Sequence, residues 1–282
     1  MCGLLTEIAR KPIDDQKFAQ GLKAIEHRGP DSFNSWKSER GGEFIQMGHT
    51  RLSIIDLAGG QQPLVSHDET IVATVNGEFY DYKRIRKHLQ DRGHHFKTES
   101  DSEILIALYE EYSTGMFEWL RGEFAFILHD RRKNLTLAAR DRFGIKPLHY
   151  HQDKDSLFFC SEIKSLKSYG VDLKPDHDFL MGTFLSPVMM HQRTAFEGVR
   201  HLDPGYYYVY KNGELSKYQY WDIDPSQKQK ITKEEAVEAY SEKLKEAIRL
   251  RLVADVPVAS YLSGGIDSSA IFSLATKEFG YD

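Results

Sequence analysis

The chain begins Met1-Cys2-Gly3-Leu4-Leu5, and an apolar strand is predicted directly after Cys2, over residues 4–9. Removal of Met1 would leave one residue with both a thiol and a free α-amino group. The thiol reacts as a thiolate, with an unperturbed pKa of about 8.5, and the amine titrates near about 7.7–8.0. Nucleophile and base can then lie on one residue, the chemistry of an N-terminal-nucleophile hydrolase. From its position alone, Cys2 could equally be an incidental terminal cysteine, so the rest of the sequence has to decide.

Composition excludes several classes of protein. The 282 residues are 40% hydrophobic and 28% charged, as in a globular protein, and the net charge of −5 provides no basic field for nucleic acid. Two cysteines are too few for a disulfide framework, which favours a reducing cytoplasm. We expect no signal peptide and no membrane span, because no basic leader and no run of roughly 18–20 apolar residues is seen.

Apolar periodicity divides the first 210 residues into alternating strands and helices. Further strands are predicted over 43–49, 71–76, 123–129, 135–140, 156–161 and 206–210, and helices over 15–27, 81–91 and 102–112. Asn212-Gly213 is typical of a hairpin turn. The polar residues 222–230 are interpreted as a linker.

A second α/β segment is predicted after this linker. Thr232 and Glu235 form a capping box that opens a helix, whose apolar face consists of Val237, Tyr240, Leu244, Ile248 and Leu252. Residues 257–262 are predicted to form a buried strand, followed by a Gly-Gly turn and a helix that begins at Asp267. A parallel sheet cannot bury both faces with one strand, so the part after about residue 230 is expected to be disordered alone or completed by further chain.

The segment Leu262-Ser263-Gly264-Gly265-Ile266-Asp267-Ser268-Ser269 predicts a phosphate site. A strand, a glycine turn and a helix N-terminus present unpaired N–H groups and the positive end of a helix dipole. A bare Gly-Gly would more often be a plain turn, but the whole string resembles the pyrophosphate loop of ATP-pyrophosphatases that form acyl-adenylates. It is not the loop of kinases and GTPases.

The front of the chain resembles class II glutamine amidotransferase domains. The matching pieces are Met1-Cys2-Gly3, His27-Arg28-Gly29-Pro30-Asp31, Arg51-Leu52-Ser53-Ile54-Ile55-Asp56, Asn76-Gly77-Glu78-Phe79-Tyr80, Ser100-Asp101-Ser102-Glu103 and Arg140-Asp141-Arg142-Phe143-Gly144-Ile145-Lys146-Pro147-Leu148. Together with the pyrophosphate loop they resemble the glutamine-hydrolysing asparagine synthetases. The resemblance implies an α+β fold: a four-layer α/β/β/α Ntn-hydrolase sandwich, followed by a truncated α/β synthetase domain. Its implied domains are residues 2–210 (glutaminase), 211–231 (hairpin and linker) and 232–282 (start of the synthetase domain).

The resemblance also implies roles for single residues. Cys2 would attack glutamine, while the Asn76 side chain and the Gly77 N–H stabilise the oxyanion. Arg51 would hold the α-carboxylate through its planar fork, and Asp101 the α-ammonium, with Glu78 nearby. The other implied glutamine contacts are Leu52, Ser53, Ile54 and Ile55. Taken alone, Asn76-Gly77 would fit a hairpin turn, and a single Arg or Asp a solvated surface charge.

For the second domain, the resemblance implies that ATP binds at Leu262, Ser263, Gly264, Gly265, Asp267, Ser268 and Ser269. ATP would arrive with Mg²⁺, and we expect no prosthetic group and no metal site formed by the protein alone. Ammonia from glutamine would amidate an adenylated carboxylate, by default aspartate, and a homodimer is left open. The alternatives are a related amidotransferase with another carboxylate substrate, and a non-hydrolysing relative such as the β-lactam synthetases, which lack the terminal cysteine.

Three further residues or segments are assigned structural roles. We do not expect His27 to be a catalytic base, although His27 and Asp31 suggest a Cys-His-Asp triad; residues 28–31 are expected to shape the site near Cys2. Cys160 lies in an apolar strand and is predicted to be a buried core thiol. Residues 140–148 are predicted to be scaffold.

Overall fold

The computed structural model describes residues 1–185 and 192–281. They form two compact units, one made of Met1–Ser53 and Ala58–Asp222, the other of Ile54–Leu57 and Ile223–Asp282. None of the described helices combines the length and the apolar character that a bilayer-crossing segment needs.

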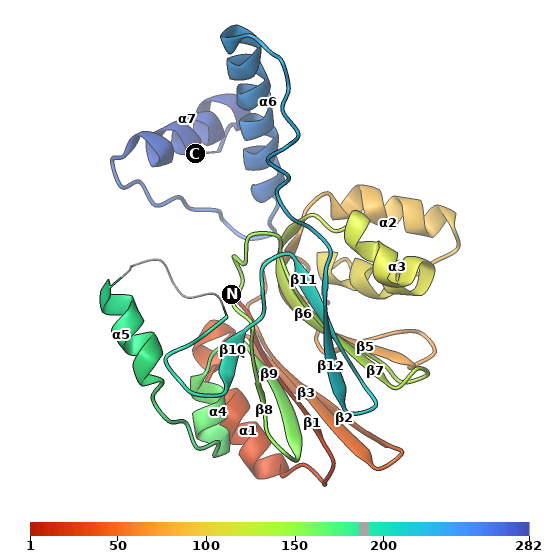
Figure 1. The fold of residues 1–282 in the computed structure, drawn as a ribbon. Coiled ribbons are helices and arrows are strands. Elements are labelled where there is room, and N and C mark those ends of the chain that lie inside the picture. Colours follow the sequence, from red (N-terminus) through yellow and green to blue (C-terminus); the bar gives the residue numbers. More distant parts are fainter. Residues whose placement is uncertain (186–191, 282) are drawn as a thin grey trace. The chain divides into compact units, whose positions relative to one another are not determined.

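Two antiparallel six-stranded sheets form the body of the first unit (Figure 1). The first sheet has the order β10-β8-β9-β1-β3-β2 and consists of β1 (Gly3–Ala9), β2 (Ser32–Arg40), β3 (Glu43–Arg51), β8 (His149–Gln152), β9 (Ser156–Cys160) and β10 (Val199–His201). The second has the order β12-β11-β7-β6-β5-β4 and consists of β4 (Leu64–Val65), β5 (Ile71–Phe79), β6 (Gly122–Asp130), β7 (Leu135–Arg140), β11 (Tyr206–Lys211) and β12 (Glu214–Gln219).

The strand that follows Cys2 lies inside the first sheet. All seven residues of β1 are buried, and β1 pairs with β3 on one side and β9 on the other. Alternate residues of β1 face opposite sides of the sheet. Leu4 and Ile8 belong to the core between the two sheets, whereas Leu5 packs under helices on the outer face.

Helices cover the outer face of each sheet. The first sheet is covered by α1 (Asp15–Lys23) and α4 (Lys164–Tyr169), through a core that includes Phe18, Leu22 and Leu166. The second is covered by α2 (Tyr82–Asp91) and α3 (Ile104–Tyr112) (Figure 1). A further helix, α5, spans His177–Leu185. The order helix, sheet, sheet, helix confirms the predicted four-layer α+β sandwich.

One helix prediction within this unit needs correction, and several elements, β2 among them, were not predicted. The helix predicted over residues 15–27 ends at Lys23, and Glu26–Arg28 form a 3₁₀ turn. This turn brings Gly29 so close to β3 that a Cβ there would lie 2.3 Å from the Thr50 carbonyl, so a continued helix would not fit. Strand β2 was not predicted, because it lies at a sheet edge and its mostly exposed sequence shows no apolar alternation.

The second unit contains two helices among its described residues, α6 (Lys233–Arg251) and α7 (Ile266–Phe279). The capping box is confirmed: Thr232 Oγ1 accepts from Glu235 N at 3.2 Å, and Glu235 Oε2 accepts from Thr232 N at 2.7 Å. Two residues of the predicted apolar face, Val237 and Tyr240, are exposed, whereas Ile248 is buried.

The buried strand predicted over residues 257–262 is wrong. These residues form neither helix nor strand, and Tyr261 is fully exposed. A strand needs a hydrogen-bonded neighbour, and the described residues of this unit offer none. In the part after about residue 230, α6 and α7 contact each other. The expectation that this part is disordered alone or completed by further chain stays a prediction.

Candidate active site

Cys2 lies at the start of β1, half-buried, with its sulfur facing the end of β3. Its Sγ accepts from Leu52 N at 3.5 Å and lies 3.8 Å from Leu52 O. Burial raises the pKa of the Cys2 thiol, and the Leu52 N–H and the charge of Arg51 oppose this rise. The thiol is therefore mainly protonated at neutral pH, and a nearby base is needed to make it a nucleophile.

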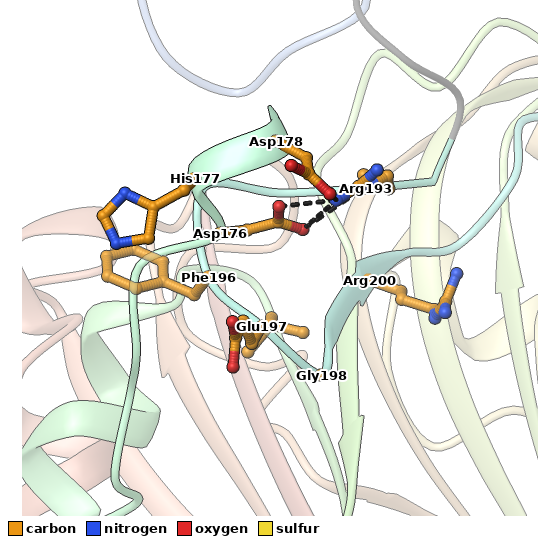
Figure 2. A pocket seen from close by; sticks show the side chains of 9 residues that line it. Asp176, His177, Asp178, Arg193, Phe196, Glu197, Gly198 and Arg200 are labelled. Carbon is orange, nitrogen blue, oxygen red and sulfur yellow. Dashed lines mark hydrogen bonds and ion pairs between the residues drawn. The ribbon is translucent and has the colours of Figure 1, made fainter. Parts of the chain in front are cut away.

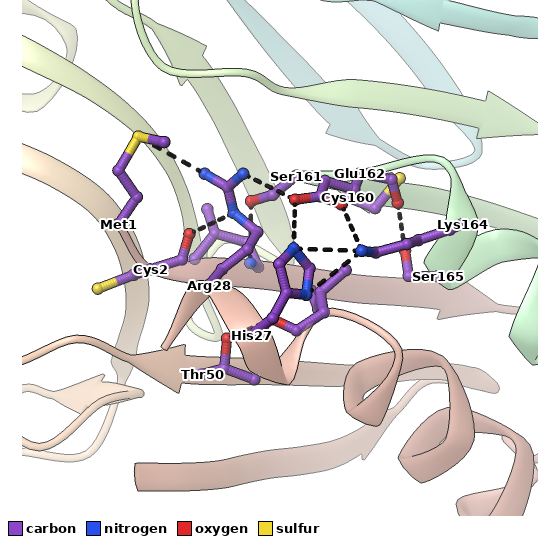
Figure 3. Close-up of polar contacts among 12 residues, drawn as sticks. Met1, Cys2, His27, Arg28, Thr50, Cys160, Ser161, Glu162, Lys164 and Ser165 are labelled. Carbon is purple, nitrogen blue, oxygen red and sulfur yellow. Dashed lines mark hydrogen bonds and ion pairs between the residues drawn. The ribbon is translucent and has the colours of Figure 1, made fainter. Parts of the chain in front are cut away.

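Arg28 holds the backbone of Cys2. Its Nε donates to Cys2 O at 2.9 Å, and its Nη1 donates to Glu162 Oε1 at 2.8 Å (Figure 3). Close by, Asp31 Oδ2 accepts from Ser53 N at 2.7 Å. The expectation that residues 28–31 shape the site near Cys2 is confirmed by these contacts.

His27 faces away from the chemistry. Its Nε2 lies 3.1 Å from Glu162 Oε1, its side chain is 54% exposed, and Lys164 Nζ lies beside the ring (Figure 3). No contact joins His27 to Cys2, so a Cys-His-Asp triad is not assembled, as expected. The other cysteine, Cys160, is fully buried, which raises the pKa of its thiol to about 12 and confirms it as a core residue.

Asn76 presents a buried amide with no partner. It lies on β5, is fully buried, and neither its Nδ2 nor its Oδ1 has a hydrogen-bonding partner among the described residues. Its side chain faces the layer between the sheets, because Val72, four residues earlier on the same strand, does so. Leaving such a group unpaired costs about 1–3 kcal/mol, so it calls for a functional explanation.

Gly77 directs its N–H to the outer edge of β5. In an antiparallel ladder, alternate residues point their N–H and C=O groups to opposite neighbours. Phe79 N points away from β6, because it donates to Asp101 Oδ2 at 2.8 Å, so Gly77 N, two residues earlier, points the same way. Only glycine fits here, since a Cβ at Gly77 would lie 2.0 Å from Glu123 O on β6.

Asp101 is a buried carboxylate, and its hydrogen-bonding partners among the described residues are neutral. It begins a 3₁₀ turn after Ser100, is 4% exposed, and accepts from Phe79 N. Burial raises its pKa to about 6. No ion pair joins it to a lysine or arginine among the described residues, so the site has a negative charge to offer an ammonium group.

Arg51 is a buried guanidinium at the end of β3. It is 4% exposed, and its Nη1 donates to Gly59 O at 2.6 Å. A Cβ at Gly60 would lie 2.7 Å from Nη2, so the glycines of this loop leave room for the guanidinium. Arg51 and Asp101 shift the pKa of Cys2 in opposite directions, which indicates that both charges lie near the thiol.

Of the remaining predicted glutamine contacts, some lie near Cys2 and the N-terminus and others group with the second unit. Leu52 and Ser53 lie beside Cys2 and Asp31, and Glu78 is close enough to the N-terminus to raise the pKa of its amine. Ile54 and Ile55 group with the second unit, so their contact with glutamine stays a prediction.

Lys146 was not predicted as part of the site. It is 7% exposed, its Nζ lies 2.8 Å from Glu123 Oε1, and its charge lowers the pKa of the N-terminal amine. The loop that carries it is tied down by Arg140, which donates to the carbonyls of Gly144, Lys146 and Leu202 at 2.6–2.9 Å. These bonds agree with the predicted scaffold role of residues 140–148, but nothing in the sequence marked Lys146 within them as a charge that acts on the N-terminal amine.

A hollow beside the start of α5 contains charged residues of its own (Figure 2). Arg193 bridges to Asp176 through Nε at 3.1 Å and Nη2 at 2.7 Å, and its Nη2 lies 3.9 Å from Asp178. The guanidinium is thus occupied by two carboxylates, and none of the predicted site residues lines this hollow.

In the second unit, the predicted phosphate loop forms the start of α7. Gly264 has φ +81°, and Gly265 is the N-cap without a side-chain capping bond. The hydroxyls of Ser263 and Ser268 lie 2.9 Å apart, and Leu262 and Ile266 are exposed. The first N–H groups of the helix are thus not capped by a side chain, which suits an anion.

Comparison with known proteins identifies the family. A glutamine amidotransferase domain matches residues 1–221, and an asparagine synthase domain matches residues 239–280. The chain belongs to the glutamine amidotransferase family. Within this amidotransferase, Cys2, Arg51, Asn76, Gly77 and Asp101 all lie in the matched part, as do Arg28 and Lys146.

Two kinds of curated relatives resemble this amidotransferase. Amidase chry2 of Gibberella zeae is 41% identical over 98% of the chain and 43% of its own length. Asparagine synthetase [glutamine-hydrolyzing] 3 of Bacillus subtilis is 34% identical over 99% of the chain and 46% of its own length. The chain therefore spans less than half the length of these two relatives.

Solved structures agree on the fold. The glutamine phosphoribosylpyrophosphate amidotransferase of B. subtilis aligns with a TM-score of 0.59 and 16% identity, covering 97% of this chain and 64% of that one. At this identity the likeness concerns the fold alone, which is the sandwich described above.

Proposed function

We propose that this chain hydrolyses glutamine to glutamate and ammonia with Cys2 as the nucleophile. The observation that carries the proposal is the buried Asn76 amide without a partner among the described residues. It lies on the same strand as the Gly77 N–H and as Phe79, which donates to Asp101, a charge that acts on the Cys2 thiol. Acyl transfer requires a nucleophile together with hydrogen-bond donors that stabilise the oxyanion. Arg51 and Asp101 supply the two charges that complement the α-carboxylate and α-ammonium of glutamine.

The proposed reaction has two halves. The α-amine of Cys2 takes the thiol proton, Sγ attacks the amide carbon, and the oxyanion binds to Asn76 Nδ2 and Gly77 N–H. The protonated amine then gives its proton to the leaving nitrogen, and ammonia departs with formation of a thioester. Water attacks the thioester, loses a proton to the amine, and releases glutamate and the thiol.

This scheme requires that Met1 be removed, because in the intact chain the nitrogen of Cys2 is an amide. The Met1 side chain lies outside the core, with the residue 53% exposed. Arg28 Nε donates to the Cys2 carbonyl at 2.9 Å, whereas its Nη2 lies 3.9 Å from Met1 Sδ. Because the bond to Cys2 does not involve Met1, we expect Cys2 to keep its place after cleavage.

For the whole protein we propose an ATP-dependent amidation of a carboxylate, with aspartate as the first candidate acceptor and asparagine as the product. The support is the asparagine synthase match and the relatives named for that activity. Residues 262–269 would hold the phosphates of ATP through the open N-terminus of α7, and Mg²⁺ would arrive with the nucleotide. A cytoplasmic location and a homodimer also stay proposals.

A second candidate is amidation of a carboxylate other than aspartate. It is favoured by the amidase of Gibberella zeae, which is more similar to this chain than the asparagine synthetase of Bacillus subtilis. A full-length protein given glutamine, ATP and single carboxylates separates the two, because only the true acceptor yields an amide and AMP together.

The glutaminase proposal is tested by measuring glutamate release, with the intact mass recorded before and after 6-diazo-5-oxo-norleucine. We expect a Met1-free chain, turnover, and one adduct on Cys2. A Met1-free chain with neither turnover nor adduct, in both the 282-residue chain and the full-length protein, would contradict it.

A further inference from the structure

A side chain, rather than a strand, closes the outer edge of β5. β4 pairs with β5 only through Leu64 with Ala73 and Val65 with Val72. The same register would set Gln62 opposite Val75, but β4 begins only at Leu64. The Gln62 side chain pairs instead: its Oε1 accepts from Val75 N at 2.6 Å, and its Nε2 donates to Val75 O at 3.3 Å.

The carbonyl oxygen of Val75 also contacts a second buried side chain, which belongs to the other sheet. His49 on β3 is 1% exposed, and its Nε2 lies 3.0 Å from Val75 O. Burial lowers the pKa of His49 to about 4, so the ring is neutral at pH 7 and its proton lies on Nε2, facing this acceptor. Gln62 and His49 thus converge on one carbonyl from two layers of the sandwich.

This carbonyl belongs to the peptide bond that leads into Asn76. Gln62 and His49 therefore hold the peptide directly before the two oxyanion donors, the Asn76 amide and the Gly77 N–H. On the other side, Gly77 is pressed against β6 with no room for a Cβ. Rotation of the Val75 peptide would move both donors together, and a misplacement of about 1 Å can cost ~10²-fold in rate.

We propose that Gln62, assisted by His49, is a positioning residue for glutamine hydrolysis. It fixes the Val75–Asn76 peptide and so sets the geometry of both oxyanion donors, without touching substrate. The inference rests on the proposed glutaminase function and adds to it two residues that lie outside the motifs of Asn76, Asp101 and Cys2.

The chain contains a matched control for Gln62. Gln46 on β3 is also 5% exposed, but it pairs opposite Glu7 and Lys37 and lines a hollow with Pro12 and Ile13. A change of either glutamine to methionine keeps the length of the side chain and removes its amide. Only the change at Gln62 leaves Val75 without its pair.

The test compares Gln62→Met and Gln46→Met in the full chain, by kcat and KM for glutamine and by alkylation of Cys2 with iodoacetamide. We expect kcat of Gln62→Met to fall about 10- to 100-fold with KM within about threefold, because oxyanion donors act on the transition state. Alkylation needs the thiolate but no oxyanion donor, so its rate should match wild type. Gln46→Met should keep the wild-type kcat.

Gln62→Glu supplies the rescue. A protonated glutamate can accept from Val75 N and donate to Val75 O as glutamine does, whereas the carboxylate cannot donate. We expect the ratio of its kcat to that of wild type to rise as the pH falls from 8 to 5.5. The pH dependence of Gln62→Glu therefore tests the positioning role even if Gln62→Met fails to fold.

Two results would overturn the positioning role: an unchanged kcat in Gln62→Met, or a flat ratio in Gln62→Glu. If one of these results is obtained while Cys2→Ala is inactive, the positioning role of Gln62 is contradicted but the glutaminase function is supported. If kcat is unchanged and KM is raised, Gln62 makes a binding contact and does not align the oxyanion donors.

Discussion

The glutamine motifs and the phosphate motif are both easily seen in the sequence, but the two units surround them differently. Arg51, Asn76 and Asp101 are each at most 4% exposed and are held by strands of two sheets. In the second unit, Leu262 is 55% and Ile266 89% exposed at the start of one helix. A helix N-terminus forms from local sequence, whereas a buried pair of opposite charges needs a complete core around it.

The largest effect should come from the nucleophile. Cys2→Ala is expected to lower glutamine turnover by more than about 10³-fold, because no other thiol can form the acyl intermediate. Glutamate release measures it, and Cys160→Ala is the matched control, since that thiol is buried in the core. An equal loss of turnover in both variants would show that the substitutions disturb the fold and would not support Cys2 as the nucleophile.

Asn76→Leu separates the activity of the first unit from its stability. We expect kcat to fall roughly 10²–10³-fold, as for loss of one oxyanion donor. The thermal midpoint should stay level or rise, because leucine of similar shape removes a buried amide that has no partner. A clear fall of the midpoint would mean that Asn76 has a structural partner in solution.

Asp101 predicts a pH dependence of glutamine binding. Its pKa is raised to about 6, so below pH 6 it becomes neutral and loses its attraction for the α-ammonium. We expect KM to rise up to about tenfold per pH unit below pH 6. Asp101→Asn should raise KM at pH 7.5 and remove this dependence; a wild-type KM that is constant from pH 7.5 to 5 would contradict the assignment.

Asp101 changes the stability of the fold with pH in the direction opposite to that of most carboxylates. Because the folded-state pKa of Asp101 lies above its unfolded value of about 3.9, its contribution to stability falls as the pH rises from about 4 through 6. Asp101→Asn should therefore raise the unfolding midpoint at pH 7.5 while it weakens glutamine binding.

The smallest effect is expected in the second unit. Val237→Ser on α6 should change the free energy of unfolding by less than about 0.5 kcal/mol, because Val237 is 61% exposed. The matched change in the first unit is Leu5→Ala, which is fully buried and should cost about 2–5 kcal/mol. Denaturant unfolding of both variants measures the difference, and a large loss for Val237→Ser would show that its face is covered in solution.

The sequence by itself indicated the four-layer sandwich and the candidate glutamine contacts through its resemblance to class II glutamine amidotransferases. Local order alone identified the candidate nucleophile, a cysteine before an apolar strand, and the capping box at Thr232. It was wrong about residues 257–262, because apolar residues predict a strand but cannot supply its neighbour.

Only the tertiary structure decided which residues support the site. No pattern in the sequence assigned a role in the site to Gln62, His49 or Lys146, because their roles depend on contacts between segments far apart in the chain. The Gln62 side chain pairs with Val75 beyond the end of β4, and His49 reaches Val75 from the other sheet. Sequence periodicity assigns a residue to a face, but the partner across that face is fixed by packing alone.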